Sequence, residues 1–407
     1  MSKLSRREKL AQFLQKIVFL HIALFFLRNL YFIVEKCFRK DRSTLLYFLT
    51  EKFYYDNSKY LFEHLRNKKD FNSILFTPHR ELYEKINQIY PGEVVYANSL
   101  RGFLLFFRTK NVIISYGTSA AAFKPFYLHE RCKNIIYMGH GTPVKRIGLQ
   151  TPVWRKHGKK FQLQKYSYLT ACSDVECLML ASGFDVELDR IWITGLPRTD
   201  YLLNPKIQNP EILKNHPYLE KKIILYAPTW REYGYKTQFF PFKDFDAKKI
   251  EDFLEQNDAY ILIRGHKEDI KRNSLNKEFD IFSIERVLPA EQAQFPDVNQ
   301  LLPFVDQLVT DYSSILVDFL LLNRPVCFLP YDLEQYNSYK GILLDYEKTT
   351  PGAKAFTQKD FLNHLKIYMD KPQTDKKWRQ EVCDMYHHHQ DGKSCERIYQ
   401  RLKEICL

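Results

Sequence analysis

The sequence predicts an α/β protein made of two halves, each with a parallel sheet covered by helices. From residue 71 onward, short apolar runs rich in Ile, Val and Tyr alternate with longer segments that have helical spacing. Strands that alternate with helices in this way form parallel sheets. A polar interval with three prolines, residues 204–217, then interrupts the pattern before it resumes. The chain therefore divides into two domains at this interval.

The expected strands follow from the apolar runs. In the first half they are residues 73–78, 93–97, 111–117, 134–139 and 191–195, with a helix at 175–182. In the second half they are residues 222–227, 259–264, 307–310 and 325–329. A helical tail at 378–407 is expected to pack back across the first domain. The predicted domains are residues 1–70 (an N-terminal helical segment), 71–205 and 216–407.

The N-terminal segment carries four basic residues and one acid among residues 1–9, followed by an apolar stretch at 17–27. That stretch is too short to span a bilayer, which requires about 20 residues. No small-residue cleavage site follows it, so it does not have the pattern of a signal peptide. Two interpretations stay open: a helix buried in the first domain, or a helix lying in the plane of an anionic membrane surface.

Composition excludes several classes of protein. The 407 residues are 45% hydrophobic, which rules out a disordered chain or a disulfide scaffold. Lysine and arginine number 61 against 48 acidic residues, and the resulting charge of +13 favours an anionic partner. The basic residues are dispersed through the chain and are not interleaved with aromatics in one region, so we expect no nucleic-acid partner.

No cofactor or metal is expected from the motifs. The chain contains neither a Gly-x-Gly-x-x-Gly fingerprint nor a Walker-type loop. The eight cysteines include no Cys-x-x-Cys pair and are expected to be reduced thiols. The run His387-His388-His389 has no other ligand at metal spacing, which predicts a solvated turn. Asp244 and Asp246 form an Asp-x-Asp pattern, but they lie among lysines with no preceding strand, so we interpret them as surface residues.

His140 is the first candidate for catalysis. It lies between Gly139 and Gly141, directly after an expected strand, and Lys145 follows within reach of an anion. Ligands bind at the carboxyl ends of strands in open α/β sheets, and flanking glycines allow close approach. An imidazole with a pKa near 6.5 can accept a proton at neutral pH. The pattern therefore favours a catalytic histidine over one that only ends a strand.

Two further clusters follow strands of the second half. Arg264 and His266 come after the apolar run 259–263. Ser313 and Ser314 mark a change from strand to helix, where amide groups and hydroxyls can bind phosphate. Asp318 is one helical turn beyond Ser314 in an apolar helix, so it needs a partner: a ribose, a basic side chain or backbone. Taken singly, the first cluster is also typical of an ordinary strand end and the second of an ordinary helix cap.

Together these segments resemble the CDP-glycerol glycerophosphotransferase family, the polymerases and primases of teichoic acid and related capsule polymers. The resemblance covers about 200 residues and leaves residues 1 to about 110 unmatched. Its blocks run in one order: His140-Gly141-Thr142-Pro143 with Lys145 and Gly148, Ile193 to Asp200, Leu225 to Arg231, Arg264-Gly265-His266, and Thr310 to Ser314 with Asp318, Asn323-Arg324-Pro325 and Tyr331 to Glu334 with Tyr336.

The resemblance implies a GT-B fold, with two Rossmann-like domains facing each other across a cleft. By similarity, His140 is the general base that deprotonates an acceptor hydroxyl. His266, Ser313 and Ser314 are the residues that hold the CDP diphosphate, with Arg264 and Lys145 as helpers. The same resemblance places Thr229, Arg231, Asp311 and Asp318 among the substrate-binding residues. Gly265 differs from the residue types usual in the family at that position, which affects the role expected for Arg264 most.

The implied reaction is transfer of glycerol phosphate from CDP-glycerol to a hydroxyl of a lipid- or polysaccharide-linked acceptor, with release of CMP. The expected location is the cytoplasm, peripheral on the inner face of the cell membrane. Three alternatives stay open: a CDP-ribitol or other CDP-polyol donor, a GT-B glycosyltransferase that uses a nucleotide sugar, and a binding protein without enzymatic activity. The sequence does not indicate an oligomeric state.

Overall fold

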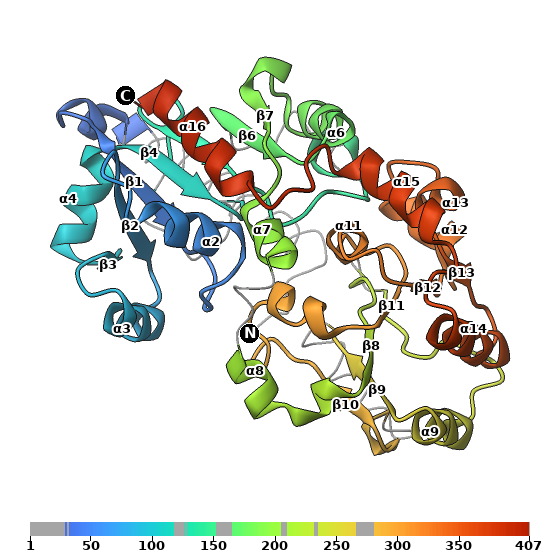
Figure 1. The fold of residues 1–407 in the computed structure, drawn as a ribbon. Coiled ribbons are helices and arrows are strands. Elements are labelled where there is room, and N and C mark those ends of the chain that lie inside the picture. Colours follow the sequence, from blue (N-terminus) through green and yellow to red (C-terminus); the bar gives the residue numbers. More distant parts are fainter. Residues whose placement is uncertain are drawn as a thin grey trace, which may run out of the picture.

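Two parallel sheets form the frame of the protein (Figure 1). The computed structural model describes residues 29–30, 32–117, 126, 128–151, 165–204, 210–231, 235–265 and 281–406. Within these residues the strands of the first sheet are β1 (Asp41–Phe48), β2 (Asn72–Thr77), β3 (Val94–Tyr96), β4 (Thr109–Ile114), β5 (Asn134–Tyr137), β6 (Tyr168–Ala171) and β7 (Ile191–Ile193). Those of the second are β8 (Lys222–Tyr226), β9 (Ala259–Ile263), β10 (Val287–Pro289), β11 (Gln307–Thr310), β12 (Val326–Phe328) and β13 (Ala353–Lys354).

Helices cover both faces of each sheet. In the first domain they are α2 (Asp56–Leu65), α3 (Arg80–Ile89), α4 (Leu100–Arg108), α6 (Asp174–Phe184) and α7 (Pro197–Leu203). In the second part of the chain they are α8 (Pro210–Asn215), α9 (Ala247–Gln256), α11 (Ile315–Leu320), α12 (Leu333–Tyr339), α13 (Tyr346–Thr349), α14 (Gln358–Asp370), α15 (Lys376–Tyr386) and α16 (Ser394–Cys406). The α/β prediction is confirmed.

The alternation of side chains along the strands creates separate cores on the two faces. In β1, Leu46 and Phe48 pack on the face covered by α4 and α6, whereas Leu45 and Tyr47 pack on the face covered by α2, α3 and α16. The second sheet has α11 and α15 on one face and α9 and α14 on the other. Because both faces are buried, the strands are apolar runs, and this is why the sequence revealed most of them.

The order of the strands determines where ligands can bind. The first sheet has the order β3-β2-β1-β4-β5-β6-β7 and the second β10-β9-β8-β11-β12-β13. In each sheet the order reverses beside the first strand, so the connections after β1 and β4, or after β8 and β11, run to opposite faces. Ligands of open α/β sheets bind outside the carboxyl ends of the strands at this point. Both domains thus offer a crevice at the place where the candidate site residues occur.

The first sheet begins at Asp41, whereas the sequence analysis assigned residues 1–70 to a helical segment. β1 lies between β2 and β4 near the centre of the sheet. Its residues 41–44 are polar and only its last four are apolar, so the run was too short to be recognised. The first domain therefore includes residues 41–70, and this boundary is corrected. The apolar stretch at 17–27 lies outside the described residues.

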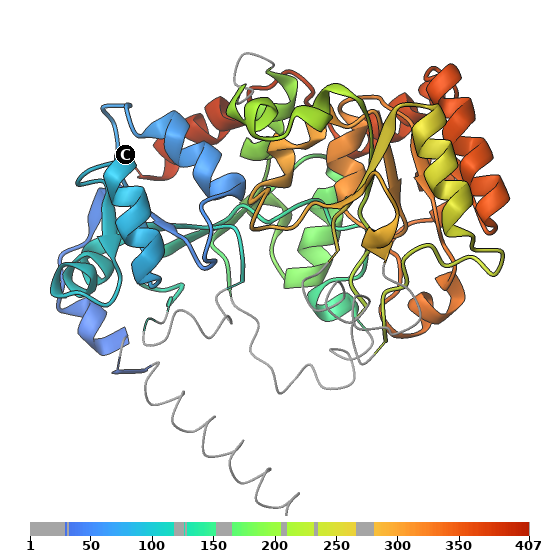
Figure 2. The ribbon, with the colours of Figure 1, turned by 90° about the horizontal axis from the view of Figure 1, so that it is seen from below.

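Several contacts connect the two domains. The backbones of Lys145 and Ile342 form an antiparallel bridge, and the Tyr60 hydroxyl donates a 2.6 Å hydrogen bond to Asp297. The last helix, α16, returns to the first domain, where its amides at Ser394 and Cys395 donate to Asp200. Figures 1 and 2 show this helix alongside the first sheet. Within the described part of the chain, no helix is both long and apolar enough to cross a membrane.

The segment between α15 and α16 corrects one expectation. His387 is buried, and its Nε2 lies 2.8 Å from the carbonyl oxygen of Val317 on α11. Burial lowers the pKa of His387 to about 4. His388 is exposed, as expected of a solvated turn. The first of the three histidines therefore packs in the protein and attaches the C-terminal segment to α11.

Candidate active site

A cleft of about 560 Å³ lies between the carboxyl ends of the two sheets. Its wall in the first domain comes from the segments after β1, β4 and β5 and from the start of α7. Its wall in the second domain comes from the segments after β8, β9, β10 and β11. The residues that line it are Tyr55, Asp56, Tyr116, His140, Arg198, Ala227, Pro228, Trp230, Arg264, Gly265, Glu291, Gln292, Pro296, Asp297, Val298, Asn299, Ser313, Ser314, Ile315 and Asp318.

His140 lies in this cleft, three residues beyond the end of β5 at Tyr137. Its ring stacks on Tyr116 with 4.8 Å between the centroids and remains accessible to solvent. The protein that surrounds the imidazole lowers the pKa of His140, and the charges of Arg198 and Lys145 act in the same direction against the opposing effect of Asp56. The ring is therefore neutral at physiological pH, which is the state that a general base requires.

The opposite wall carries Ser313, Ser314 and Arg264. Ser314 precedes α11, and its hydroxyl makes no capping bond to that helix. The Arg264 guanidinium is held by the carbonyl oxygens of Ala290 and Phe295, at 3.1 and 2.9 Å. Burial lowers the pKa of Arg264 relative to its ordinary value, yet arginine stays charged at physiological pH. This wall thus presents two hydroxyls and a cation, which are suitable partners for phosphate oxygens.

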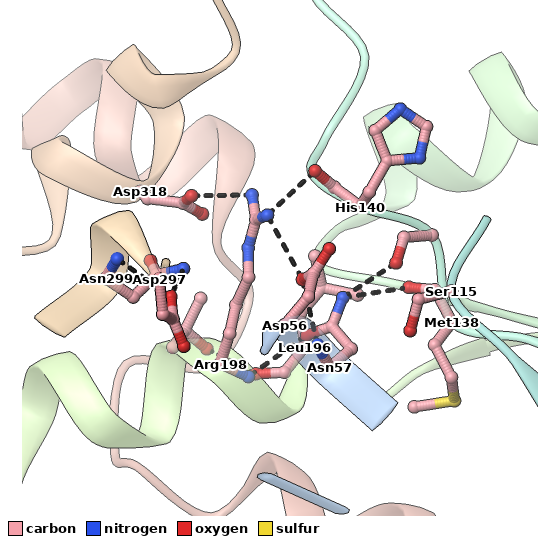
Figure 3. Close-up of polar contacts among 12 residues, drawn as sticks. Asp56, Asn57, Ser115, Met138, His140, Leu196, Arg198, Asp297, Asn299 and Asp318 are labelled. Carbon is pink, nitrogen blue, oxygen red and sulfur yellow. Dashed lines mark hydrogen bonds and ion pairs between the residues drawn. The ribbon is translucent and has the colours of Figure 1, made fainter. Parts of the chain in front are cut away.

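Asp318 is paired with Arg198, a residue to which the sequence analysis gave no role. Arg198 Nη2 donates to Asp318 Oδ2 at 2.6 Å, and Nη1 lies 3.4 Å from Asp56 Oδ1 (Figure 3). All three side chains are buried. Burial raises the pKa of Asp318 to about 6, and the negative charges of Asp56 and Asp297 add to this effect against the opposing charge of Arg198. Of the three partners the sequence allowed for Asp318, the structure therefore shows a basic side chain.

Arg231, Asp311 and Thr229 lie beneath the cleft and do not line it. Arg231 is fully buried and binds Asp332 through two nitrogens, at 2.8 and 2.7 Å, and Asp311 at 2.9 Å. Asp311 also accepts the amide of Thr229 at 2.8 Å. This buried network joins the segment after β8 to the segment after β11. Its geometry supports a role in shaping the cleft more than direct contact with substrate.

The remaining candidates are placed as follows. Lys145 is not among the residues that line the cleft; its backbone bridges to the second domain, and its charge affects His140. His266 lies outside the described residues. The structure therefore brings together His140, Arg264, Ser313, Ser314 and Asp318, and it adds Asp56, Tyr116 and Arg198 from the first domain.

The described residues contain no cluster of three or more His, Cys, Asp or Glu side chains able to hold a metal ion. Asp244 and Asp246, the Asp-x-Asp pattern, are engaged in local structure: Asp244 accepts the amide of Gln358, and Asp246 accepts the amides of Lys248 and Lys249 at the start of α9. Both contacts agree with the interpretation of this motif as part of the surface.

Glu176 supports the loop that carries His140. Its Oε2 accepts the Thr142 hydroxyl at 3.0 Å and the Cys172 amide at 2.6 Å. Complete burial raises the pKa of Glu176 from 4.5 to about 7. Because the folded-state pKa lies above the ordinary value, the stability that the neutral Glu176 contributes is present below about pH 4.5 and is lost as the pH rises from there to about 7.

We therefore expect Glu176→Gln to stabilise the protein at pH 8.5. The Gln carbonyl oxygen can accept both hydrogen bonds without a buried charge, so the gain is about 1–3 kcal/mol, or roughly 2–10 °C in Tm. At pH 4, below the ordinary pKa of the carboxyl group, the difference should nearly vanish. Thermal unfolding at both pH values, with the exposed Glu187→Gln as the control, measures this effect. An equal shift at the two pH values would contradict it.

Comparisons with known proteins identify the family. A family model described as CDP-Glycerol:Poly(glycerophosphate) glycerophosphotransferase matches residues 30–404. The teichoic acid glycerol-phosphate transferase of Staphylococcus aureus (strain NCTC 8325 / PS 47) is 29% identical over 86% of this chain and 90% of its own length. The teichoic acid poly(ribitol-phosphate) polymerase of Bacillus spizizenii (strain ATCC 23059 / NRRL B-14472 / W23) is 30% identical, but the match covers only 54% of this chain and 35% of that protein.

Solved structures confirm the predicted fold. The wall teichoic acid polymerase TagF aligns over 98% of both chains with a TM-score of 0.71 and 21% sequence identity. The UDP-GlcNAc 2-epimerase of Neisseria meningitidis aligns over 89% of this chain and 99% of its own with a TM-score of 0.54 and 13% identity. At these identities the likeness concerns the fold, which is of the GT-B type. Because the family model spans nearly the whole described structure, the chain belongs to the CDP-glycerol:poly(glycerophosphate) glycerophosphotransferase family.

Proposed function

We propose that this protein transfers glycerol phosphate from CDP-glycerol to a hydroxyl group of a teichoic-acid-type acceptor and releases CMP. One observation carries the proposal beyond family membership: His140 from one domain and Ser313 and Ser314 from the other line the same cleft. A base and a phosphate-binding wall on opposite sides of one cavity are what transfer of a phosphoryl group to a hydroxyl requires.

The mechanism follows from this arrangement. The acceptor hydroxyl attacks the phosphorus that bears the glycerol, and its proton passes to the neutral imidazole of His140. A new P–O bond forms while the bond to the CMP phosphate breaks, and CMP leaves with the bonding electrons. Ser313, Ser314 and Arg264 hold the diphosphate and stabilise the charge that develops on its oxygens. His266 is proposed to assist them.

The roles of the deeper residues are indirect. Thr229, Arg231 and Asp311 hold the segments after β8 and β11 in place, and we propose that they shape the donor pocket. Lys145 is proposed to act through its positive charge near His140. A nucleotide pocket between these segments agrees with the site expected at the switch point of a parallel sheet.

We further propose that the acceptor is linked to a lipid or a polysaccharide and that the enzyme works at the inner face of the cell membrane. The support is the charge of +13 together with the basic residues of the N-terminal segment. Glycerol is the proposed polyol because the Staphylococcus aureus glycerol-phosphate transferase aligns over most of both chains, whereas the match to the ribitol-phosphate polymerase covers about half of this chain.

Incubation of the purified protein with CDP-glycerol and a lipid-linked teichoic acid primer tests the reaction. CMP should appear only when both substrates are present, and CDP-ribitol in parallel reports the choice of polyol. Release of a nucleoside diphosphate from a nucleotide sugar, without CMP from either CDP-polyol, would refute the proposal.

The pH dependence supplies a second test. Since the pKa of His140 is lowered, kcat/KM should be constant from about pH 7 to 8 and should fall on the acid side with an apparent pKa below 6.5. Initial rates of CMP release measured from pH 5 to 8 give this profile. An acid limb centred above pH 7 would contradict His140 as a neutral base in this environment.

A further inference from the structure

Arg198 lies between the wall of the cleft that carries His140 and the wall that carries Ser313 and Ser314. It lies in the first turn of α7, and its side chain is 7% exposed. Nη1 donates to the carbonyl oxygen of His140 at 2.7 Å, while Nη2 donates to Asp318 at 2.6 Å. Asp318 belongs to α11, the helix that follows Ser313 and Ser314. One guanidinium therefore joins the backbone of the proposed base to the helix behind the proposed phosphate site (Figure 3).

Gly141 shows how closely these groups approach one another. Its φ of +131° is a conformation that side chains disfavour. A Cβ atom at this position would lie 2.5 Å from Arg198 Nη2 and 3.3 Å from Ser314 Oγ. The guanidinium thus packs against the backbone next to His140, and the Ser314 hydroxyl lies at the same place. The close contacts among Gly141, Arg198 and Ser314 therefore fix how the two walls lie relative to each other.

Residues at the start of α2 bind Arg198 and hold it in place. Asp56 has a φ of +67° and contacts Nη1 through Oδ1. The side chain of Asn57 accepts the Arg198 amide at 3.0 Å and donates to the Gly139 carbonyl at 2.9 Å. Ser58 is hydrogen-bonded to Ser115 at 2.7 Å. Three successive residues therefore hold α7, the strand end before His140 and the segment that carries Tyr116.

We propose that Arg198 is a positioning residue that keeps His140 in register with Ser313 and Ser314 by bridging the His140 carbonyl to Asp318. The inference rests on the proposed function and adds to it a residue that acts through other groups. Nη1 contacts the His140 carbonyl and Asp56, and Nη2 donates to Asp318, so both terminal nitrogens of the guanidinium bind protein acceptors. Nε has no hydrogen-bond partner among the described residues. Direct contact of Nε with the donor is the competing explanation.

Arg198→Lys and Asp318→Asn separate these explanations. Lysine keeps the charge but cannot bridge two acceptors in the fixed geometry of the guanidinium. If Arg198 positions His140, kcat for CMP release should fall about 10- to 100-fold in both variants, with KM for CDP-glycerol changed less than about 3-fold. The double variant should be no worse than the poorer single variant, because both remove the same link. The exposed Asp189→Asn serves as the control for loss of one carboxylate.

The pH profile distinguishes positioning from general loss of structure. The charged groups around His140 are Asp56 on α2, Lys145 on its own loop, Arg198 on α7 and, behind Arg198, Asp318 on α11. Arg198→Gln removes a positive charge near the imidazole, so the acid limb of kcat/KM should move to higher pH, whereas Arg198→Lys should leave it nearly in place. Loss of packing alone would lower the rate in both variants without this difference.

An activity-independent measurement covers the case in which the proposed reaction itself fails. Spin labels introduced at the exposed Leu188 and Ile367, with the exposed Cys37 replaced by serine, report the distance between the domains. Asp318→Asn should broaden the distance distribution, even if wild-type protein releases no CMP. The positioning role would be overturned by any of three results: an unchanged distance distribution, full kcat in Arg198→Lys, or a rise in KM above about 10-fold at unchanged kcat. The last of these results would instead show that Arg198 contacts the donor directly.

Discussion

His140→Ala should lower the rate of CMP release by about 10² to 10⁴, the usual contribution of a general base. The variant should still bind CDP-glycerol with an affinity close to that of the wild type. The imidazole points away from Arg198 and Asp318, so its removal leaves the second-domain wall unchanged (Figure 3). Initial rates together with equilibrium binding of CDP-glycerol separate these two effects.

The control for this experiment is His388→Ala. His388 is exposed, its ring lies 3.8 Å from Asp174, and it is not among the residues that line the cleft. Its replacement should leave the rate of CMP release within about twofold, because substitutions of exposed side chains outside a site usually have small effects. A normal rate of CMP release by His140→Ala would show that His140 is not the general base. Equal losses in both variants would show that the assay reports stability and not catalysis.

The sequence predicted the parts of the fold whose signal is local. Most apolar runs of both sheets were recognisable because both faces of a parallel sheet are buried. The short strands β6, β10 and β13, of four, three and two residues, were not predicted. β1 was missed, since half of it is polar, and with it the segment after β1 was lost. That segment carries Asp56, which has a φ of +67°. Nothing in the neighbouring sequence indicated this backbone conformation. An unrecognised central strand therefore concealed the part of the first-domain wall that Tyr55 and Asp56 form.

The site was predictable only where one segment carried several polar groups. His140, Ser313 and Ser314 stand in such segments, and all three line the cleft. Arg198 belongs to a block that matched the family, but its partners Asp318 and Asp56 lie 120 and 142 residues away in the chain. Pairing across such separations is a property of the folded structure. No spacing in the sequence could have distinguished Arg198 from any other arginine beside a strand.

Arg231 is the reverse case: the sequence suggested contact with the substrate, whereas the structure places the side chain beneath the cleft. Its block suggested substrate binding, but its guanidinium is completely buried between Asp311 and Asp332 and lies over the rings of Tyr312, Tyr331 and Tyr336 at 5.1 to 5.3 Å. The two carboxylates raise the pKa of Arg231 against the opposing effect of burial. Such a cation is needed wherever two acids are enclosed together, because an uncompensated buried carboxylate is unfavourable.

Arg231→Met should consequently be the most destabilising of the substitutions considered. Removing one partner of a buried ion pair costs about 3–5 kcal/mol, because the remaining charges are left uncompensated. For a domain of this size the loss corresponds to a fall in Tm of at least about 6 °C. The matched control is Arg286→Met: Arg286 also pairs with an aspartate, Asp258 at 2.9 Å, and lies over a tyrosine ring, but its partner is 55% exposed.

The control should lower Tm by no more than about 4 °C, since exposed ion pairs contribute about 1 kcal/mol or less. Thermal unfolding of both variants measures the difference that burial makes to otherwise similar pairs. Arg231→Met should also raise KM for CDP-glycerol at temperatures where it remains folded, because the ion pair between Arg231 and Asp311 would no longer help to hold the segments after β8 and β11 together. Equal changes in Tm for the two variants would show that Arg231 is not the structural centre of this wall, and its assignment to substrate contact would then be favoured.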